Sequence, residues 1–143
     1  MSRVGGVPSV VVMNPTLADP SPGAALIHAL AGADRDAARG LLAPDLVFRA
    51  LLPPLVVELD DRERVLDLLA GWFPPGGVEE LEEVGSGTVL DRHRVSYRVR
   101  WHDAAGDRFV FEQQAYYDVG DAGITWMHLL CTGHRSLPEK GER

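Results

Sequence analysis

The segment Glu112-Gln113-Gln114-Ala115-Tyr116-Tyr117 places an acid, an amide and a phenol at alternate positions of a predicted strand. Alternate residues of a strand point to the same face, so Glu112, Gln114 and Tyr116 would act together. A carboxyl group in apolar surroundings has a raised pKa and can serve as general acid or base near neutral pH. An amide N–H and a phenol O–H can hold a developing oxyanion or a ligand carbonyl. The trio therefore predicts acid–base chemistry on a carbonyl compound, with Glu112 carrying the proton.

The same trio also has interpretations that involve no chemistry. A Glu–Gln pair on a strand is often a structural hydrogen-bonding group, or it lies at the wet mouth of a cavity. Glu112 could instead pair with Arg49 or another arginine and only fix the shape of the fold. A register shift of one residue would turn Gln113 and Tyr117 inward in place of the trio.

Length and composition indicate one globular domain. The chain has 143 residues, of which 45% are hydrophobic and 24% charged, enough for a single core. Its net charge of −7, without a basic stripe, argues against nucleic acid as a partner. No apolar run approaches the roughly 20 residues of a membrane span, and residues 10–13 are too short for a signal-peptide core. We therefore expect a cytoplasmic protein that neither binds nucleic acid nor enters a membrane.

Cysteine and histidine spacing gives no sign of a bound metal. Cys131 is the single cysteine of the sequence, so an internal disulfide and an all-cysteine metal site are both excluded. We find no His-Glu-x-x-His motif and no glycine-rich loop that leads into a helix, as a phosphate site needs. The sequence thus predicts no metal and no cofactor, and Cys131 is expected to be a small buried hydrophobe.

Helix signals lie in the first half of the sequence and strand signals in the second. Ser21-Pro22, Asp34, and Asp60 or Asp61 each precede an apolar pattern, as N-cap residues do. The helices expected from these signals cover residues 21–31, 34–42 and 60–73. Apolar runs and period-two alternation predict strands at residues 46–52, 78–91, 92–102, 108–119 and 123–134.

This order of elements predicts an α+β fold, with three N-terminal helices packed on one face of a curved antiparallel sheet. The domain is expected to cover residues 21–136. Residues 1–20 are rich in Gly and Pro and predict a flexible N-terminal arm, and residues 137–143 a disordered tail.

Three short motifs carry a resemblance to a known superfamily. They are Gly32-Ala33-Asp34, the stretch Leu-Leu-Ala-Pro-Asp-Leu-Val-Phe at 41–48, and Tyr117-Asp118-Val119 followed by Gly123-Ile124. Their order and spacing, over residues 22–135, resemble the nuclear transport factor 2-like superfamily, which includes SnoaL-like polyketide cyclases, ketosteroid isomerases and limonene epoxide hydrolases. Within it, Glu-Gln-Gln-Ala-Tyr and Leu-Leu-Cys-Thr-Gly-His-Arg are similar to bacterial members without an assigned activity. The resemblance implies a cone whose sheet wraps around the helices and leaves an apolar ligand cavity open at one end.

The resemblance also implies which side chains face that cavity. Aligned with the isomerases, Glu112, Gln114 and Tyr116 point inward, and Gln114 takes the place of a protonated Asp that stabilises an enolate. Strand alternation adds the inward side of residues 92–102. The residues expected to line the ligand are Leu26, Phe48, His93, Tyr97, Trp101, Met127, Leu129 and Cys131. The outer face of the sheet, with Tyr117 and His128, would then form a homodimer interface.

Some catalytic positions of the superfamily are not kept. The isomerase base position falls on Ala50 and its tyrosine position on Leu26, and no strand has the Arg-x-Asp spacing of the epoxide hydrolases. We therefore expect a protein that binds a small hydrophobic metabolite, as a cofactor-free cyclase, isomerase or dehydratase. The alternative is a non-catalytic ligand-binding or dimerisation module.

Overall fold

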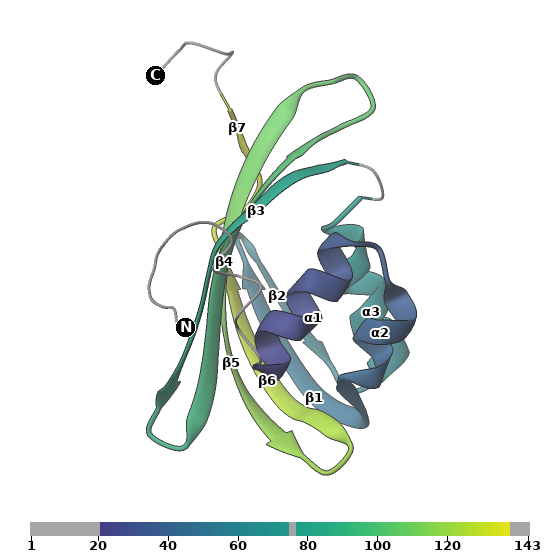
Figure 1. Cartoon of the computed structure of the whole chain (residues 1–143), viewed down its shortest axis with the longest axis vertical. Coiled ribbons are helices and arrows are strands. Elements are labelled where there is room, and N and C mark those ends of the chain that lie inside the picture. The colour runs from purple at the N-terminus through teal and green to yellow at the C-terminus, as the bar shows by residue number, and fades with distance from the viewer. Residues whose placement is uncertain (1–20, 75–76, 138–143) are drawn as a thin grey trace, which may run out of the picture.

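Three helices and seven strands make up the described part of the protein, residues 21–74 and 77–137, in a computed structural model (Figure 1). The elements in chain order are α1 (Pro22–Ala31), α2 (Arg35–Gly40), β1 (Leu42–Leu52), β2 (Leu55–Leu59), α3 (Arg62–Gly71), β3 (Val78–Val89), β4 (Arg92–His102), β5 (Arg108–Gly120), β6 (Gly123–Cys131) and β7 (Arg135–Ser136). The predicted arm, residues 1–20, and residues 138–143 of the predicted tail lie outside the described residues. The α+β class is confirmed.

The three helices begin at the capping residues that the sequence indicates. The Ser21 side chain accepts a hydrogen bond from the Ala24 N–H, and Asp34 and Asp61 do the same for α2 and α3. Each cap satisfies a backbone N–H group that has no partner within its helix. None of the described helices combines the length and the apolar character that crossing a membrane would need.

The strands form one sheet in the order β2-β1-β6-β5-β4-β3, with β7 added beside β5. β1 runs parallel to β6, whereas the other pairs are antiparallel. The predicted all-antiparallel sheet is therefore wrong, because side-chain alternation gives the faces of a strand but neither its partner nor its direction. β2 was also not expected.

One face of the sheet packs against the helices, and we call it the inner face. Its buried side chains from β1, β4, β5 and β6 include Leu46, Phe48, Ala50, Val95, Tyr97, Val99, Phe111, Gln113, Ala115, Tyr117, Ile124, Met127, Leu129 and Cys131. The helices add apolar side chains to the same core, among them Leu26, Ile27 and Leu66. Tyr117 ties the two layers together, since its hydroxyl accepts a hydrogen bond of 2.9 Å from the Gly23 N–H of α1.

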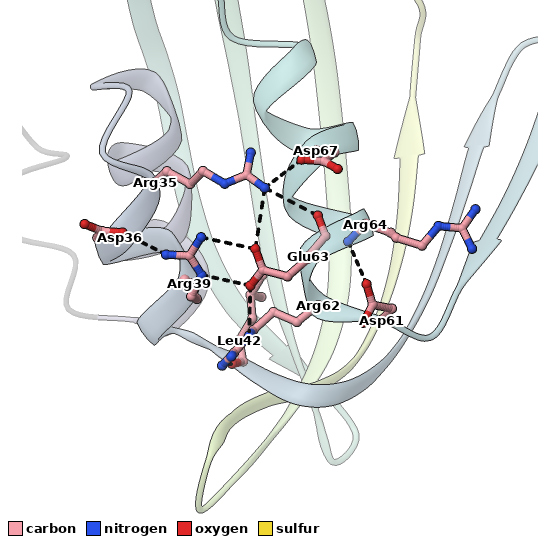
Figure 2. A network of polar contacts seen from close by, with 9 residues as sticks. All are labelled: Arg35, Asp36, Arg39, Leu42, Asp61, Arg62, Glu63, Arg64 and Asp67. Carbon is pink, nitrogen blue, oxygen red and sulfur yellow. Dashed lines mark hydrogen bonds and ion pairs between the residues drawn. The ribbon is translucent and has the colours of Figure 1, made fainter.

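A network of ion pairs joins α2 to α3 (Figure 2). Arg39 donates to Glu63 over 2.8 and 3.1 Å, and Arg35 donates to Asp67 over 2.6 Å. Hydrogen bonding to Arg39 lowers the pKa of Glu63. These side chains are partly exposed, and every carboxylate drawn in Figure 2 has a partner. We therefore interpret the network as a set of surface ion pairs that hold the two helices together.

Candidate functional site

The inward orientation predicted for Glu112, Gln114 and Tyr116 is wrong. In β5 the buried positions are Phe111, Gln113, Ala115 and Tyr117, whereas the trio is exposed or partly exposed on the opposite, outer face. The strand thus has the alternative orientation, with Gln113 and Tyr117 facing inward. Because the side-chain period of a strand is two, a shift of one residue turns the whole set to the other face. The catalytic role of the trio stays a prediction, and its location is now the outer face.

On the outer face the trio takes part in a polar surface network. Glu112 accepts a hydrogen bond of 2.8 Å from Arg98 and is 52% exposed at its side chain. The Gln114 amide donates to the Tyr116 hydroxyl over 2.8 Å. Glu112 and Gln114 line an open hollow of about 380 Å³ together with Arg98 and Leu130. Glu112 is therefore paired with an arginine, as one interpretation expected, but the pair is not buried and the arginine is not Arg49, which pairs with Glu58.

The inner face carries a polar row that crosses three strands. Tyr97 of β4 and Cys131 of β6 are the direct register partners of Gln113 in β5. The Tyr97 hydroxyl donates a hydrogen bond to Gln113 Oε1. Burial raises the pKa of Tyr97, and the neighbouring Cys131 raises it further, so the phenol stays protonated and remains a donor.

Gln113 keeps one polar group without a partner. Its side chain is 3% exposed, and Nε2 has no hydrogen-bond partner among the described residues. Turning the amide over would only exchange the free N–H group for a free carbonyl oxygen. Since a buried polar atom without a partner costs about 1–3 kcal/mol, most such atoms in proteins are satisfied by a ligand, water or side chain. Gln113 is also the one buried side chain of a polar or charged type that the structure describes.

The residues predicted to line a ligand do face inward. Leu26, Phe48, Met127, Leu129 and Cys131 are buried. The remaining three come from β4: Tyr97 is buried, whereas His93 and Trp101 are partly exposed. His93 stacks on Tyr117 with 5.2 Å between the ring centroids. Their orientation is thus confirmed, and ligand contact stays a prediction.

His134 is an inner-face residue that the sequence analysis did not single out. Its Nδ1 accepts a hydrogen bond of 2.9 Å from the indole N–H of Trp101, and its ring lies 4.7 Å from that of Phe111. Continued alternation from β6 would place His134 outward with His128. However, the strand ends at Cys131, and Gly133, with φ +84, interrupts the alternation. That glycine is the signal that could have indicated the change of face.

The described residues bring no three His, Cys, Asp or Glu side chains together in an arrangement that could hold a metal ion. The polar groups of the inner face are instead a phenol, an amide, a thiol and imidazoles. In apolar surroundings such groups can donate hydrogen bonds to a ligand oxygen. These hydrogen bonds orient the ligand, but they do not neutralise a charge on it.

Comparison with known proteins shows the fold. No protein-family model matches the chain, and no curated protein matches it in sequence. Among solved structures, it is similar to a protein of Xanthomonas campestris provisionally named a polyketide cyclase, with 21% identity and a TM-score of 0.57, over 76% of this chain and 86% of that one. It is also similar to a LEH-like epoxide hydrolase of M. tuberculosis, with 20% identity and a TM-score of 0.58, over 77% and 79%.

A third similar structure is a hypothetical protein of Catenulispora acidiphila with a ketosteroid isomerase-like fold, in complex with trimethylamine. It has 16% identity and a TM-score of 0.58, over 77% of this chain and 84% of that one. The resemblance to the nuclear transport factor 2-like superfamily is thus confirmed as a likeness of fold. Identities this low do not transfer an activity, because one fold carries many functions.

Proposed function

We propose that the protein binds a small hydrophobic molecule with a polar oxygen, such as a ketone, between the helices and the inner face of the sheet. The observation that carries this proposal is the buried amide of Gln113, which has a free N–H group beside apolar neighbours. A ligand carbonyl would supply the missing acceptor, and the apolar side chains around it would cover the rest of the molecule. A cone open at one end, as the superfamily resemblance implies, would give the ligand its way in.

The Tyr97–Gln113 hydrogen bond supports this role for the amide. Because the phenol donates to Oε1, the amide is turned so that Nε2 is the free atom. The phenol also holds the amide in place, and a fixed donor loses less freedom when a ligand binds. Acid–base turnover of the cyclase, isomerase or dehydratase kind would use other titratable groups of the inner face, Cys131 and His93, because Tyr97 stays protonated. Glu112 lies across the sheet from them.

Binding can be tested with two probes of nearly equal shape, 2-acetylnaphthalene and 2-ethylnaphthalene. We expect the ketone to bind about tenfold more tightly, because it accepts the free N–H of Gln113 and the hydrocarbon leaves it unpaired. In Gln113→Leu the two affinities should become equal. Isothermal titration calorimetry measures all four constants.

Glu112→Gln is the matched control for this test, and it should keep the tenfold preference because Glu112 is on the outer face. A wild-type protein that binds neither probe, or a preference for the ketone that survives in Gln113→Leu, would contradict the proposal. Loss of the preference for the ketone in Glu112→Gln would indicate instead that the ligand binds at Glu112, Gln114 and Tyr116 on the outer face.

We propose further that the outer face is a homodimer interface. Three of its apolar side chains are unusually exposed: Val47 at 51%, Leu51 at 42% and Leu130 at 46%. Leu51 and Leu130 are register partners and form one apolar spot, whereas Val47 pairs with Trp126 and is separated from that spot by the Arg49–His128 pair. Exposed apolar side chains on a sheet are typical of a protein interface, and a second copy of the chain offers a surface of matching shape.

Analytical ultracentrifugation tests the dimer. We expect a dimer at about 10 µM for the wild type and a monomer for Leu130→Asp, because a buried unpaired carboxylate disfavours the interface. Ala104→Asp is the control: Ala104 is exposed at the β4–β5 turn, outside the strand segments that carry these side chains, and the dimer should persist. A monomeric wild type at about 100 µM would remove the proposal.

A further inference from the structure

The chain between β6 and the end of the described residues forms a short segment, residues 132–137, that we call the strap. It contains β7, whose Arg135 and Ser136 pair with Val110 and Phe109 of β5, and it has a further backbone contact at each end. The Thr132 N–H donates to the Glu112 carbonyl over 3.0 Å, and the Leu137 N–H donates to the Arg108 carbonyl over 2.9 Å. The strap starts directly after Cys131, the register partner of Gln113. It therefore borders the polar row of the inner face.

His134 fixes the middle of the strap to the inner face. The Trp101 indole can only donate, so Nδ1 of His134 must be unprotonated to accept its hydrogen bond of 2.9 Å. The neutral ring then carries its proton on Nε2. A protonated imidazole has N–H groups on both nitrogens, and it would turn an N–H group toward the indole N–H. Protonation is therefore incompatible with this contact.

Within residues 21–74 and 77–137, no charged group stabilises a protonated His134, since loss of hydration is the cause that shifts its pKa. The elements packed against it present the aromatic rings of Trp101 and Phe111. The charged groups of the adjoining strands pair with one another elsewhere: His102 and Arg108 with Glu79, and Arg98 with Glu112. Arg135, the neighbour of His134 in the strap, is exposed.

We propose that His134 is a pH-operated latch, which holds the strap closed when neutral and releases it when protonated. Release would uncover Trp101 and Phe111 at the end of the inner face, with Phe111 two residues before Gln113 in β5. If the protein binds a ligand there, which rests on the proposed function, acid would speed the escape of that ligand. The movement of the strap itself does not depend on any ligand.

The direction of the pH effect follows from loss of hydration. His134 is exposed on one side, but its contacts with Trp101 and Phe111 remove enough water from the ring to lower its pKa below the ordinary value of 6.5. The unfolded or released strap thus takes up a proton at a higher pH than the closed strap. The stabilising contact is complete above about pH 7 and is lost as the pH falls below about 6.5.

Amide hydrogen exchange of the free protein tests the latch. After correction for intrinsic rates, we expect protection of the Thr132 and Leu137 amides to fall at least tenfold between about pH 7.5 and about pH 5. In His134→Gln the side-chain carbonyl can accept from Trp101 at any pH, so protection should be the same at both values. Protection that does not change with pH in the wild type, or that falls equally in His134→Gln, would overturn the proposal.

His128→Gln is the matched control, because burial and then the charges of Arg49 and Arg92 lower the pKa of His128 on the outer face. This variant should keep the wild-type response of the strap. An NMR titration adds a readout that does not depend on the stability of His134→Gln. Because the Trp101 N–H opposes a proton on Nδ1, the pKa of His134 should rise in Trp101→Phe, which loses this donor and keeps an aromatic ring. A pKa that is the same in Trp101→Phe and wild type would exclude the latch contact.

Discussion

Tyr117→Ala is expected to lower the free energy of unfolding by about 3–5 kcal/mol, the range for a large aromatic residue removed from a core. Tyr117 has no exposed surface, and it packs against α1 from the inner face. The variant leaves a cavity, and it also leaves the Gly23 N–H without its buried acceptor. Urea denaturation followed by circular dichroism measures the loss.

Tyr116→Ala is the control for this prediction, since the two tyrosines are adjacent and differ in the face that they occupy. Tyr116 is partly exposed on the outer face, and its hydroxyl accepts from Gln114. We expect a loss of about 1 kcal/mol or less, as for most surface substitutions. Equal losses, or a larger loss for Tyr116, would show that the inner face of β5 carries the other set of residues.

Gly123→Ala should cost about 2–5 kcal/mol, from backbone strain and overpacking together. Gly123 lies at the start of β6 with φ +119, a conformation that side chains rarely adopt. A Cβ atom there would come within 2.7 Å of the Leu41 carbonyl oxygen. The same oxygen accepts the hydrogen bond of 2.9 Å from the Ile124 N–H, so it cannot move away freely.

Gly106→Ala separates the strain from the clash. Gly106 also has a positive φ, +91, but no atom lies within 4 Å of an added Cβ. We expect a loss of about 1–2 kcal/mol from backbone strain alone. Thermal or chemical unfolding of both variants gives the difference, and a Gly123→Ala variant as stable as Gly106→Ala would contradict the close packing of β6 on Leu41.

The helices were the most predictable part of the fold, because the signals that start them are local. Ser21, Asp34 and Asp61 each cap the helix that follows, and a cap is read from one residue and its neighbours. The end of the second helix was less well predicted. The stretch Ala43-Pro44-Asp45, expected to end α2, lies within β1, at the point where its register with β6 shifts.

The orientation of β5 could have been read from its own sequence. Phe109, Phe111 and Tyr117 alternate with Arg108, Glu112 and Asp118, which indicates that the odd positions face the core. The alignment with the isomerases contradicts this pattern, because it assigns the even positions, Glu112, Gln114 and Tyr116, to the inner face. The polar row was hidden for a different reason: Tyr97, Gln113 and Cys131 belong to three strands and meet only through their register.

The parallel pairing of β1 with β6 joins segments that are far apart in the sequence. Phe48 lies beside Met127, roughly 80 residues later, so this contact closes a long loop and belongs to the slow class of folding events. While the chain is being synthesised, one edge of β1 can pair with β2, but the other has no neighbour until residues 123–131 have been made. A free edge of this kind can pair with another chain. The nascent chain therefore exposes an unpaired strand edge until β6 has been synthesised, and pairing with β6 is what removes this risk of aggregation.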